Sequence, residues 1–362
     1  MNNLHNSKAR FGMTLQEATE STFQPAISDG PPLPPVNYAA LSKSAPALPS
    51  TPTDQLPNAA AVVITWADAE WAALQHVFCS GAASMPYSDR SRSSWPGWQK
   101  YSSNLPANKP ASWGFWGYYR LVELAEKRVL LFKSNTHLDW PGAQYLIDLI
   151  KLLVREVKPG VIVSIGTAGG AKPQDHLGTV RAVSAGTLYT SGQPQSSWPE
   201  YKNAWSANTA TLSLPSFKKL LFPVPTKASD LAALCAQFNQ HYGVSYTLPQ
   251  LDPNGLNQAT STPQIDIQTG GGASLLTTST FVVGTTSGNY QNYTSIEMDD
   301  AIIGEACNAS DTAFGFVRNL SDPVQNATLP AKVQGNWGSA IYDAYGFYTS
   351  YNGAVATWAI LA

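Results

Sequence analysis

Residues 142–170 place an amphipathic helix pattern directly before an unbroken apolar run. The helix pattern, GAQYLIDLIKLLVREV (142–157), is the clearest in the chain, and Lys158-Pro159-Gly160 ends it. The following run, VIVSIGTAGG (161–170), is typical of a strand that is covered on both faces and ends in a glycine-rich turn. A helix joined so closely to a doubly covered strand is the repeating unit of α/β folds with a mostly parallel sheet.

The same alternation extends over most of the chain, and residues 191–275 interrupt it with long Pro, Ser, Thr and Gly stretches that indicate an insertion or a lid. We therefore expect an α/β fold, a single three-layer α/β/α domain with a mixed, mostly parallel central sheet. The further strands are expected at 60–67, at 113–134 (two strands around a turn near Glu126-Lys127), and at 178–190, 278–286 and 314–320. The further helices are expected at 68–78, 230–242, 301–309 and from Gly338 to the end.

A different composition marks the first part of the chain. Residues 24–58 are dense in proline and serine, and proline favours extended backbone without hydrogen-bond donors. We expect residues 1–58 to form an extended N-terminal arm, which wraps over the domain or over a partner subunit. Residues 59–362 would form the domain, with the insertion around 191–275.

Composition and charge exclude several classes of function. The formal net charge is -2, so no basic surface favours nucleic acid or an anionic membrane. No apolar run approaches the roughly 20 residues of a membrane span, and the first residues lack the apolar segment of a secretory signal. Neither the histidines nor the three cysteines (Cys79, Cys235 and Cys307) have the spacing of metal ligands. We expect a cytoplasmic protein without a metal or cofactor.

Several chemically active residues fall where predicted strands end. These are Glu70, the turn Thr167–Gly170, the acidic group Glu297–Asp300, and Ser321-Asp322. Because ligands collect beyond the carboxyl ends of strands in such sheets, these carboxylates are expected to share one edge. Crowded carboxylates there suit acid–base chemistry on a sugar, whose hydroxyl groups are donors.

Each of these residues also has a purely structural interpretation. Asp299 and Asp300 could open a helix, since acids in a first turn offset the helix dipole. Asp322 could cap a helix, and Glu70 could be an ordinary exposed acid. Met298 is equally compatible with a core position.

Four motifs, in order, resemble those of the nucleoside phosphorylase superfamily, most closely its methylthioadenosine/S-adenosylhomocysteine nucleosidase branch. They cover roughly residues 60–188 and 278–360. The motifs are VVITWADAEWAAL (62–74), KPGVIVSIGTAGGAKPQDHLGTVRAVSAGTL (158–188), SIEMDDAIIGEAC (295–307) and FVRNLSDPV (316–324).

The resemblance implies an N-glycosyl hydrolase that releases the free base from a purine nucleoside or nucleotide. It implies that Asp322, in the Ser321-Asp322 pair, is the general acid at N7 of the purine, and that Glu70 activates the attacking water. It further implies homo-oligomers, dimers or larger. The implied ligands of the sugar or the water are Glu297, Met298, Asp299, Thr167, Ala168, Gly169 and Ser321.

The chain departs from the family pattern at several positions. Asp299 stands where the family has glutamate, so its carboxylate reaches one methylene less far. His137 and Asp139 occupy a turn that is normally glycine-rich. Tyr290 and Tyr293 are the only nearby aromatic residues in the segment (284–293) that normally stacks on the base.

Two alternatives to hydrolysis remain at this point. A phosphorylase needs cationic phosphate ligands. The family's phosphorylases carry glycine and arginine in a turn where this chain reads TWADAEW and offers Glu70 instead. Because a carboxylate repels phosphate, charge favours water over phosphate as the nucleophile. Arg120, Lys133, Arg181 and Arg318 remain candidate ligands for phosphate or for a nucleotide 5′-phosphate. The second alternative is a non-catalytic nucleoside-binding or sensor protein of the same fold.

Overall fold

In the part of the chain that this computed structural model describes, the strands form one mixed sheet. The model describes residues 30–138, 140–172, 175–203, 209–226, 228–253, 265–268, 274–278, 288–322, 326 and 328–362. At its centre, β5 (Val161–Gly169) pairs in parallel with β1 (Ala61–Thr65) and with β12 (Ala313–Asp322). Next to β1 lies β4 (Lys127–Ser134), also parallel, and β3 (Gly117–Leu124) and β2 (Gln99–Tyr101) follow in antiparallel pairing.

Beyond β5 the sheet divides into two branches. One branch runs from β12 through β6 (Val180–Val183) to β9 (Ile265–Gln268). The other begins at the end of β5 and runs through β11 (Ile296–Glu297), β10 (Leu275–Thr277) and β7 (Ala185–Leu188) to β8 (Glu200–Lys202).

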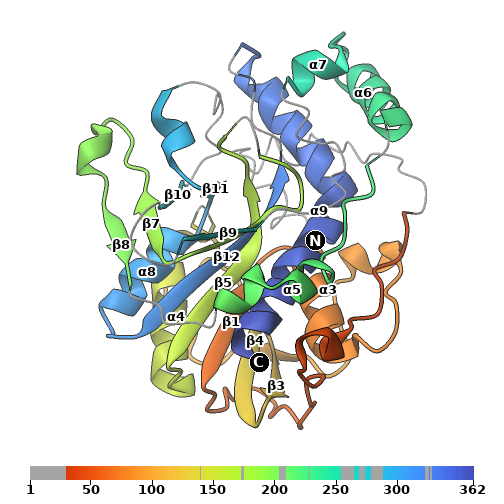
Figure 1. Ribbon diagram of the computed structural model, residues 1–362. Coiled ribbons are helices and arrows are strands. Elements are labelled where there is room, and N and C mark those ends of the chain that lie inside the picture. The colour runs from red at the N-terminus through yellow and green to blue at the C-terminus, as the bar shows by residue number, and fades with distance from the viewer. Residues whose placement is uncertain are drawn as a thin grey trace.

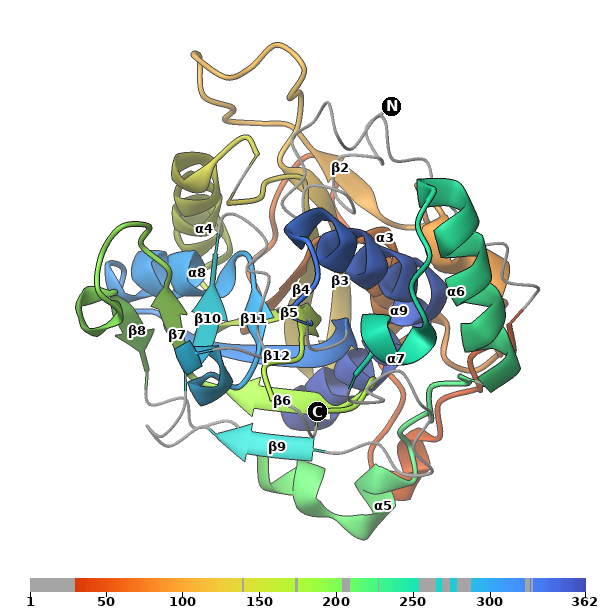
Figure 2. The same ribbon diagram turned by 90° about the horizontal axis from the view of Figure 1, so that it is seen from above.

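Helices cover both faces of this sheet, which gives the expected three layers (Figure 1). Figure 2 shows α4 (Ala143–Val157) and α8 (Asp300–Asn308) on one side of the strands, and α3 (Asp68–Gln75) and α9 (Ala331–Leu361) on the other. The side chains of β1 alternate between the two resulting cores: Val63 packs with α3 and α9, whereas Val62 and Ile64 pack with α4.

Most elements predicted from the sequence are confirmed. The hairpin turns at Ala125 and Glu126, both with positive φ, and α4 ends at Lys158 in the left-handed conformation. A short π-helical segment, η3 (His76–Ser80), continues α3. The other helices are α6 (Ala228–Tyr242) and the short η2 (Tyr38–Leu41), η4 (Tyr87–Ser91), η5 (Gln195–Ser197), η6 (Thr209–Ser213), α5 (Pro215–Lys218), α7 (Leu248–Leu251) and η7 (Gly288–Asn292).

Two strand predictions differ from the structure. The predicted strand at 178–190 is two strands, β6 and β7, which break at Ser184 and enter different branches of the sheet. The edge strand β2 lies at residues 99–101, where no strand was predicted. The predicted strand at 278–286 lies outside the described residues except for Thr278, which follows β10.

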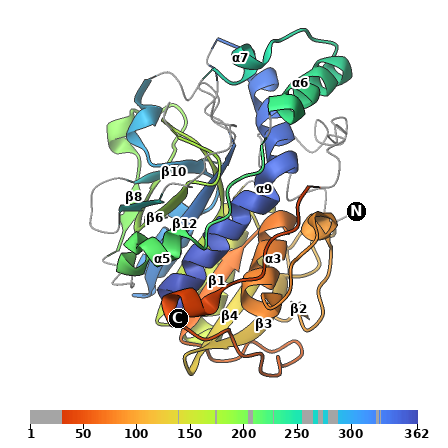
Figure 3. The ribbon, with the colours of Figure 1, turned by 45° about the vertical axis from the view of Figure 1, so that its right-hand side comes forward.

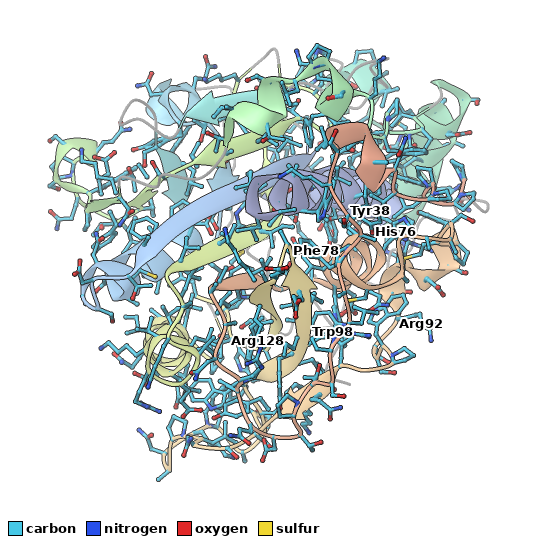
Figure 4. The ribbon with its side chains drawn as sticks, turned by 60° about the horizontal axis from the view of Figure 1, so that its bottom comes forward. Tyr38, His76, Phe78, Arg92, Trp98 and Arg128 are labelled. Atoms are coloured by element: carbon cyan, nitrogen blue, oxygen red, sulfur yellow. The ribbon has the colours of Figure 1, made fainter. Side chains whose placement is uncertain are left out.

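The described part of the arm packs against the domain. Leu33, Val36 and Tyr38 are buried in the core that α3 and α9 share. The Tyr38 hydroxyl donates to the Val77 carbonyl at 2.7 Å, and the His76 ring contacts the Pro34 carbonyl at 2.8 Å, on the face seen in Figure 4. The arm therefore contributes side chains to the core of this chain.

Residues 191–275 contribute to the sheet as well as to its periphery. From this interval come β8, β9 and the first residue of β10. The helix α6 lies beside the N-terminal half of α9 (Figure 3), where Phe238 meets Trp337 with ring centroids 5.4 Å apart. Among the described residues, no helix combines the length and apolarity that crossing a bilayer requires.

Candidate active site

A small buried cavity lies at the edge where the central parallel strands end. Its volume is about 10 Å³, the space of one water molecule. Residues that follow β1 and β4 meet there with residues from α3, from the β11–α8 junction and from β12. The cavity is lined by Trp66, Ala67, Glu70, His137, Met298, Asp299 and Arg318.

Glu70 reaches this cavity because α3 begins directly after β1. Its side chain is only 2% exposed, so the interpretation as an exposed helix acid is wrong. Oε2 accepts hydrogen bonds from the Trp66 and Ala67 amides at 3.1 and 2.9 Å and from the Thr65 hydroxyl at 2.9 Å. Oε1 accepts from the Thr167 amide at 2.8 Å and the Thr167 hydroxyl at 2.7 Å. Glu70 thus caps α3 and ties β1 to β5.

Arg318 projects from β12 across Gly166 of β5. A Cβ at Gly166 would lie 2.3 Å from Arg318 Nη1 and 3.1 Å from Glu70 Oε1, so only glycine leaves room for both groups. The guanidinium also lies over the Trp66 ring, 5.5 Å from its centroid.

Two further carboxylates hold Arg318. Nε donates to Asp300 Oδ2 at 2.7 Å, Nη2 donates to Asp300 Oδ1, and Nη2 lies 3.2 Å from Glu297 Oε2. The Ser164 hydroxyl completes the group by donating to Asp300 Oδ1 at 2.5 Å. Burial opposes the charge of Arg318, but Asp300 and Glu297 outweigh it and raise the pKa of the guanidinium. The sequence offers Arg318 as a candidate phosphate ligand, whereas the structure pairs it with Asp300 and Glu297.

Glu297 caps α8 and does not line the cavity. Its Oε2 accepts the amides of Asp299 and Asp300 at 2.7 and 3.1 Å, and its Oε1 accepts the Thr277 hydroxyl. Burial, and next the neighbouring Asp300 carboxylate, raise the pKa of Glu297 to about 8. The helix does open at Asp299 and Asp300, as the structural interpretation predicts, but the carboxylate that binds its first amides is that of Glu297.

Asp299 is the N-cap residue of α8, yet its carboxylate turns away from the helix. Oδ1 accepts the Leu138 amide at 3.1 Å, and Oδ2 lies 3.0 Å from His137 Nδ1. His137 follows β4 in the turn that departs from the family pattern, and its ring lies 6.0 Å from that of Trp66. Asp139, in the same turn, lies outside the described residues.

Asp322 is the last residue of β12 and is buried. The Ser321 hydroxyl donates to Asp322 Oδ1 at 3.0 Å. The strand register sets Asp322 opposite Gly169, which follows Thr167 and Ala168 along β5. Asp322 therefore lies further along β12 than Arg318, which lines the cavity opposite Gly166, and Asp322 itself is not among the lining residues.

The remaining candidates lie away from the cavity. Tyr293 is buried and accepts a hydrogen bond from Gln195 Nε2 at 2.9 Å. The other candidate anion ligands all have partners: Lys133 with Asp68, Arg181 with Asp175, and Arg120 with the Pro96 carbonyl. Among the described residues, histidine, cysteine and carboxylate side chains form no metal-binding group.

Comparison with known proteins gives structural likenesses only. No family model and no curated protein matches the chain. One similar structure is the 5′-methylthioadenosine/S-adenosylhomocysteine nucleosidase from Neisseria meningitidis in complex with methylthio-immucillin-A, with 13% identity and a TM-score of 0.44 over 83% of this chain and 98% of that chain. Another is futalosine hydrolase of Helicobacter pylori, with 10% identity and a TM-score of 0.44 over 83% of this chain and 97% of that chain. A third, the nucleosidase from Colwellia psychrerythraea in complex with adenine, has 14% identity and a TM-score of 0.40 over 83% and 97%.

Proposed function

We propose that this chain hydrolyses the N-glycosidic bond of a purine nucleoside or nucleotide and releases the free base. One observation carries the proposal: Glu70, Met298, Asp299 and Arg318 come from distant parts of the sequence and line one buried cavity with the size of a water molecule. The motif resemblance in the sequence supplies the reaction class for that arrangement.

Carboxylates and a buried water site suit this reaction. Cleavage passes through a sugar that resembles an oxocarbenium ion, so it develops positive charge on the sugar and negative charge on the leaving base. Asp299 lies where it would stabilise the sugar's positive charge, with Met298 as an apolar contact beside it. The attacking water would occupy the cavity itself.

We assign Asp322 as the general acid that protonates the leaving base. Its position at the end of β12, beyond the water cavity, would place it on the base side of a bound nucleoside. The hydroxyl of Ser321 orients its carboxyl group through Oδ1. The other carboxyl oxygen would then hold the proton for N7 of the purine.

Charge favours water over phosphate as the nucleophile. The cation at the cavity, Arg318, is bound by Asp300 and Glu297, and Glu70 and Asp299 add negative charge to the cavity wall. A phosphate dianion would meet these carboxylates, and among the described residues that line the cavity the one arginine is already bound by carboxylates. The same balance opposes a 5′-phosphate within this cavity.

The test is base release by the purified chain. Adenosine, methylthioadenosine, AMP and ATP would each be incubated with and without inorganic phosphate, and free base would be quantified by chromatography. We expect phosphate-independent release. A requirement for phosphate would identify a phosphorylase, and no release from any of these substrates would favour a binding protein. Asp322→Asn should abolish release while the urea midpoint of unfolding stays near wild type; near wild-type activity would refute the assignment of the acid.

A further inference from the structure

The hydrogen bonds of Glu70 bear on which group removes the proton from the attacking water. A carboxylate offers about four lone-pair sites, and Glu70 accepts at least five hydrogen bonds from the protein. Three of those donors are backbone amides that the strand and helix geometry fixes in place. A carboxylate that is fully engaged in this way is a poor acceptor for a further proton.

A second acceptor stands in the same cavity. His137 lines it, is buried, and lies with Nδ1 3.0 Å from Asp299 Oδ2. The Leu138 amide holds the other oxygen of Asp299 at 3.1 Å, which fixes the carboxylate against the ring. A carboxylate beside Nδ1 favours the tautomer that carries the proton on Nδ1, in which Nε2 is the basic atom.

We propose that the His137–Asp299 pair, rather than Glu70, accepts the proton of the attacking water. This inference rests on the proposed function. Asp299 positions the imidazole and stabilises its charged form, and Glu70 and Arg318 shape the wall of the water site.

The step balances in atoms and charge. The water oxygen forms a bond to the anomeric carbon, and one water proton passes to His137 Nε2. The bond from that carbon to the base breaks, its electron pair stays on the base, and Asp322 supplies the proton that makes the base neutral. Transfer of a proton from His137 to Asp322 through solvent restores both groups.

The charged groups around the ring come from each element packed against it. They are Asp299 at the start of α8, Glu70 on α3, and Arg318 on β12, which is itself paired with Asp300 and Glu297. Because a protonated imidazole cannot accept a proton, kcat/KM should fall as the pH is lowered.

The experiment compares His137→Gln with wild type on whichever substrate releases base. General-base catalysis contributes typically about 10²- to 10⁴-fold, so kcat should fall by about that factor with little change in KM, and the acid limb of the pH profile should disappear. His137→Ala should regain part of its activity in added imidazole. The matched control is His241→Ala, an exposed histidine on α6, which should keep wild-type kinetics.

Several outcomes would overturn the inference while the proposed function stands. One is a kcat of His137→Gln that stays near wild type. Another is a rise in the KM of that variant without a fall in kcat, which would make His137 a sugar ligand. If the variants do not fold, the wild-type acid limb decides: it should move with temperature, since imidazole ionisation carries a large enthalpy, and a limb that stays fixed indicates a carboxylate base. No base release by wild type would instead refute the proposed function.

Discussion

Removing the carboxylate of Asp300 should be one of the most destabilising single changes in this chain. Asp300 is completely buried and accepts two hydrogen bonds from Arg318 and one from Ser164. The change Asp300→Ala would leave a buried guanidinium and a buried hydroxyl without these acceptors. Breaking a buried ion pair from one side costs about 3–5 kcal/mol.

The structure indicates the lower end of this range. Asp300→Ala also removes the neighbouring carboxylate that helps to raise the pKa of Glu297, so Glu297 ionises more readily in this variant. Its Oε2 lies 3.2 Å from Arg318 Nη2 and then serves as the counterion of the guanidinium. We therefore expect Asp300→Ala to lower the free energy of unfolding by about 3 kcal/mol. That is a large part of the 5–15 kcal/mol that is usual for folded proteins.

Urea denaturation at pH 7 measures this cost, and a double-mutant cycle shows whether it comes from the ion pair. Arg318→Met alone should also destabilise the chain, since it leaves two buried carboxylates together. The double variant should lose less than the sum of the single losses by about 2 kcal/mol, because neither charge is then unpaired. As a control, Glu200→Ala breaks the exposed pair with Lys202 and should cost less than about 1 kcal/mol.

Two results would refute this reasoning. One is a loss below about 1 kcal/mol for Asp300→Ala, which would mean that Glu297 or water replaces the carboxylate fully. The other is additive losses in the cycle, which would mean that Asp300 and Arg318 contribute independently.

Three further predictions concern pH, packing and the arm. Burial and the Asp300 carboxylate raise the pKa of Glu297 from 4.5 to about 8, so between these pH values the folded chain keeps a proton that the unfolded chain has released. The free energy of unfolding should therefore fall as the pH rises from 4.5 through 8. Glu297→Gln should flatten this slope, measured as urea midpoints at different pH. Gly117→Ala should cost about 1–3 kcal/mol or more in the same assay, because its Cβ would lie 2.3 Å from a backbone oxygen of β4. Leu33→Ala should cost about 2–5 kcal/mol, since Leu33 is fully buried, whereas Leu48→Ala, at a residue 45% exposed, should cost less than about 0.5 kcal/mol.

Each of these three has a result that would contradict it. A pH slope that survives Glu297→Gln would assign the proton to another group, such as Asp300, whose pKa burial also raises. Wild-type stability of Gly117→Ala would mean that the hairpin can separate at no cost. Equal effects of Leu33→Ala and Leu48→Ala would mean that the arm does not belong to the core.

The elements of the fold follow from the sequence because their signals are local. The period of α4, the apolar runs of β1 and β5, and the stop at Lys158 all lie within windows of a few residues. The single apolar segment at 178–190 gave no signal of its break at Ser184, because that break depends on which neighbours pair with β6 and β7.

By itself, the sequence determined which residues stand at the ends of strands and therefore which carboxylates can share an edge. Only the tertiary structure decided their partners: Asp300 rather than Glu297 binds Arg318 most closely, and Asp299 turns to His137. The register of the sheet brings these groups together across more than a hundred residues of chain, as between Leu138 and Asp299. No local pattern encodes such a contact, since the side chains meet only once strands and helices have packed.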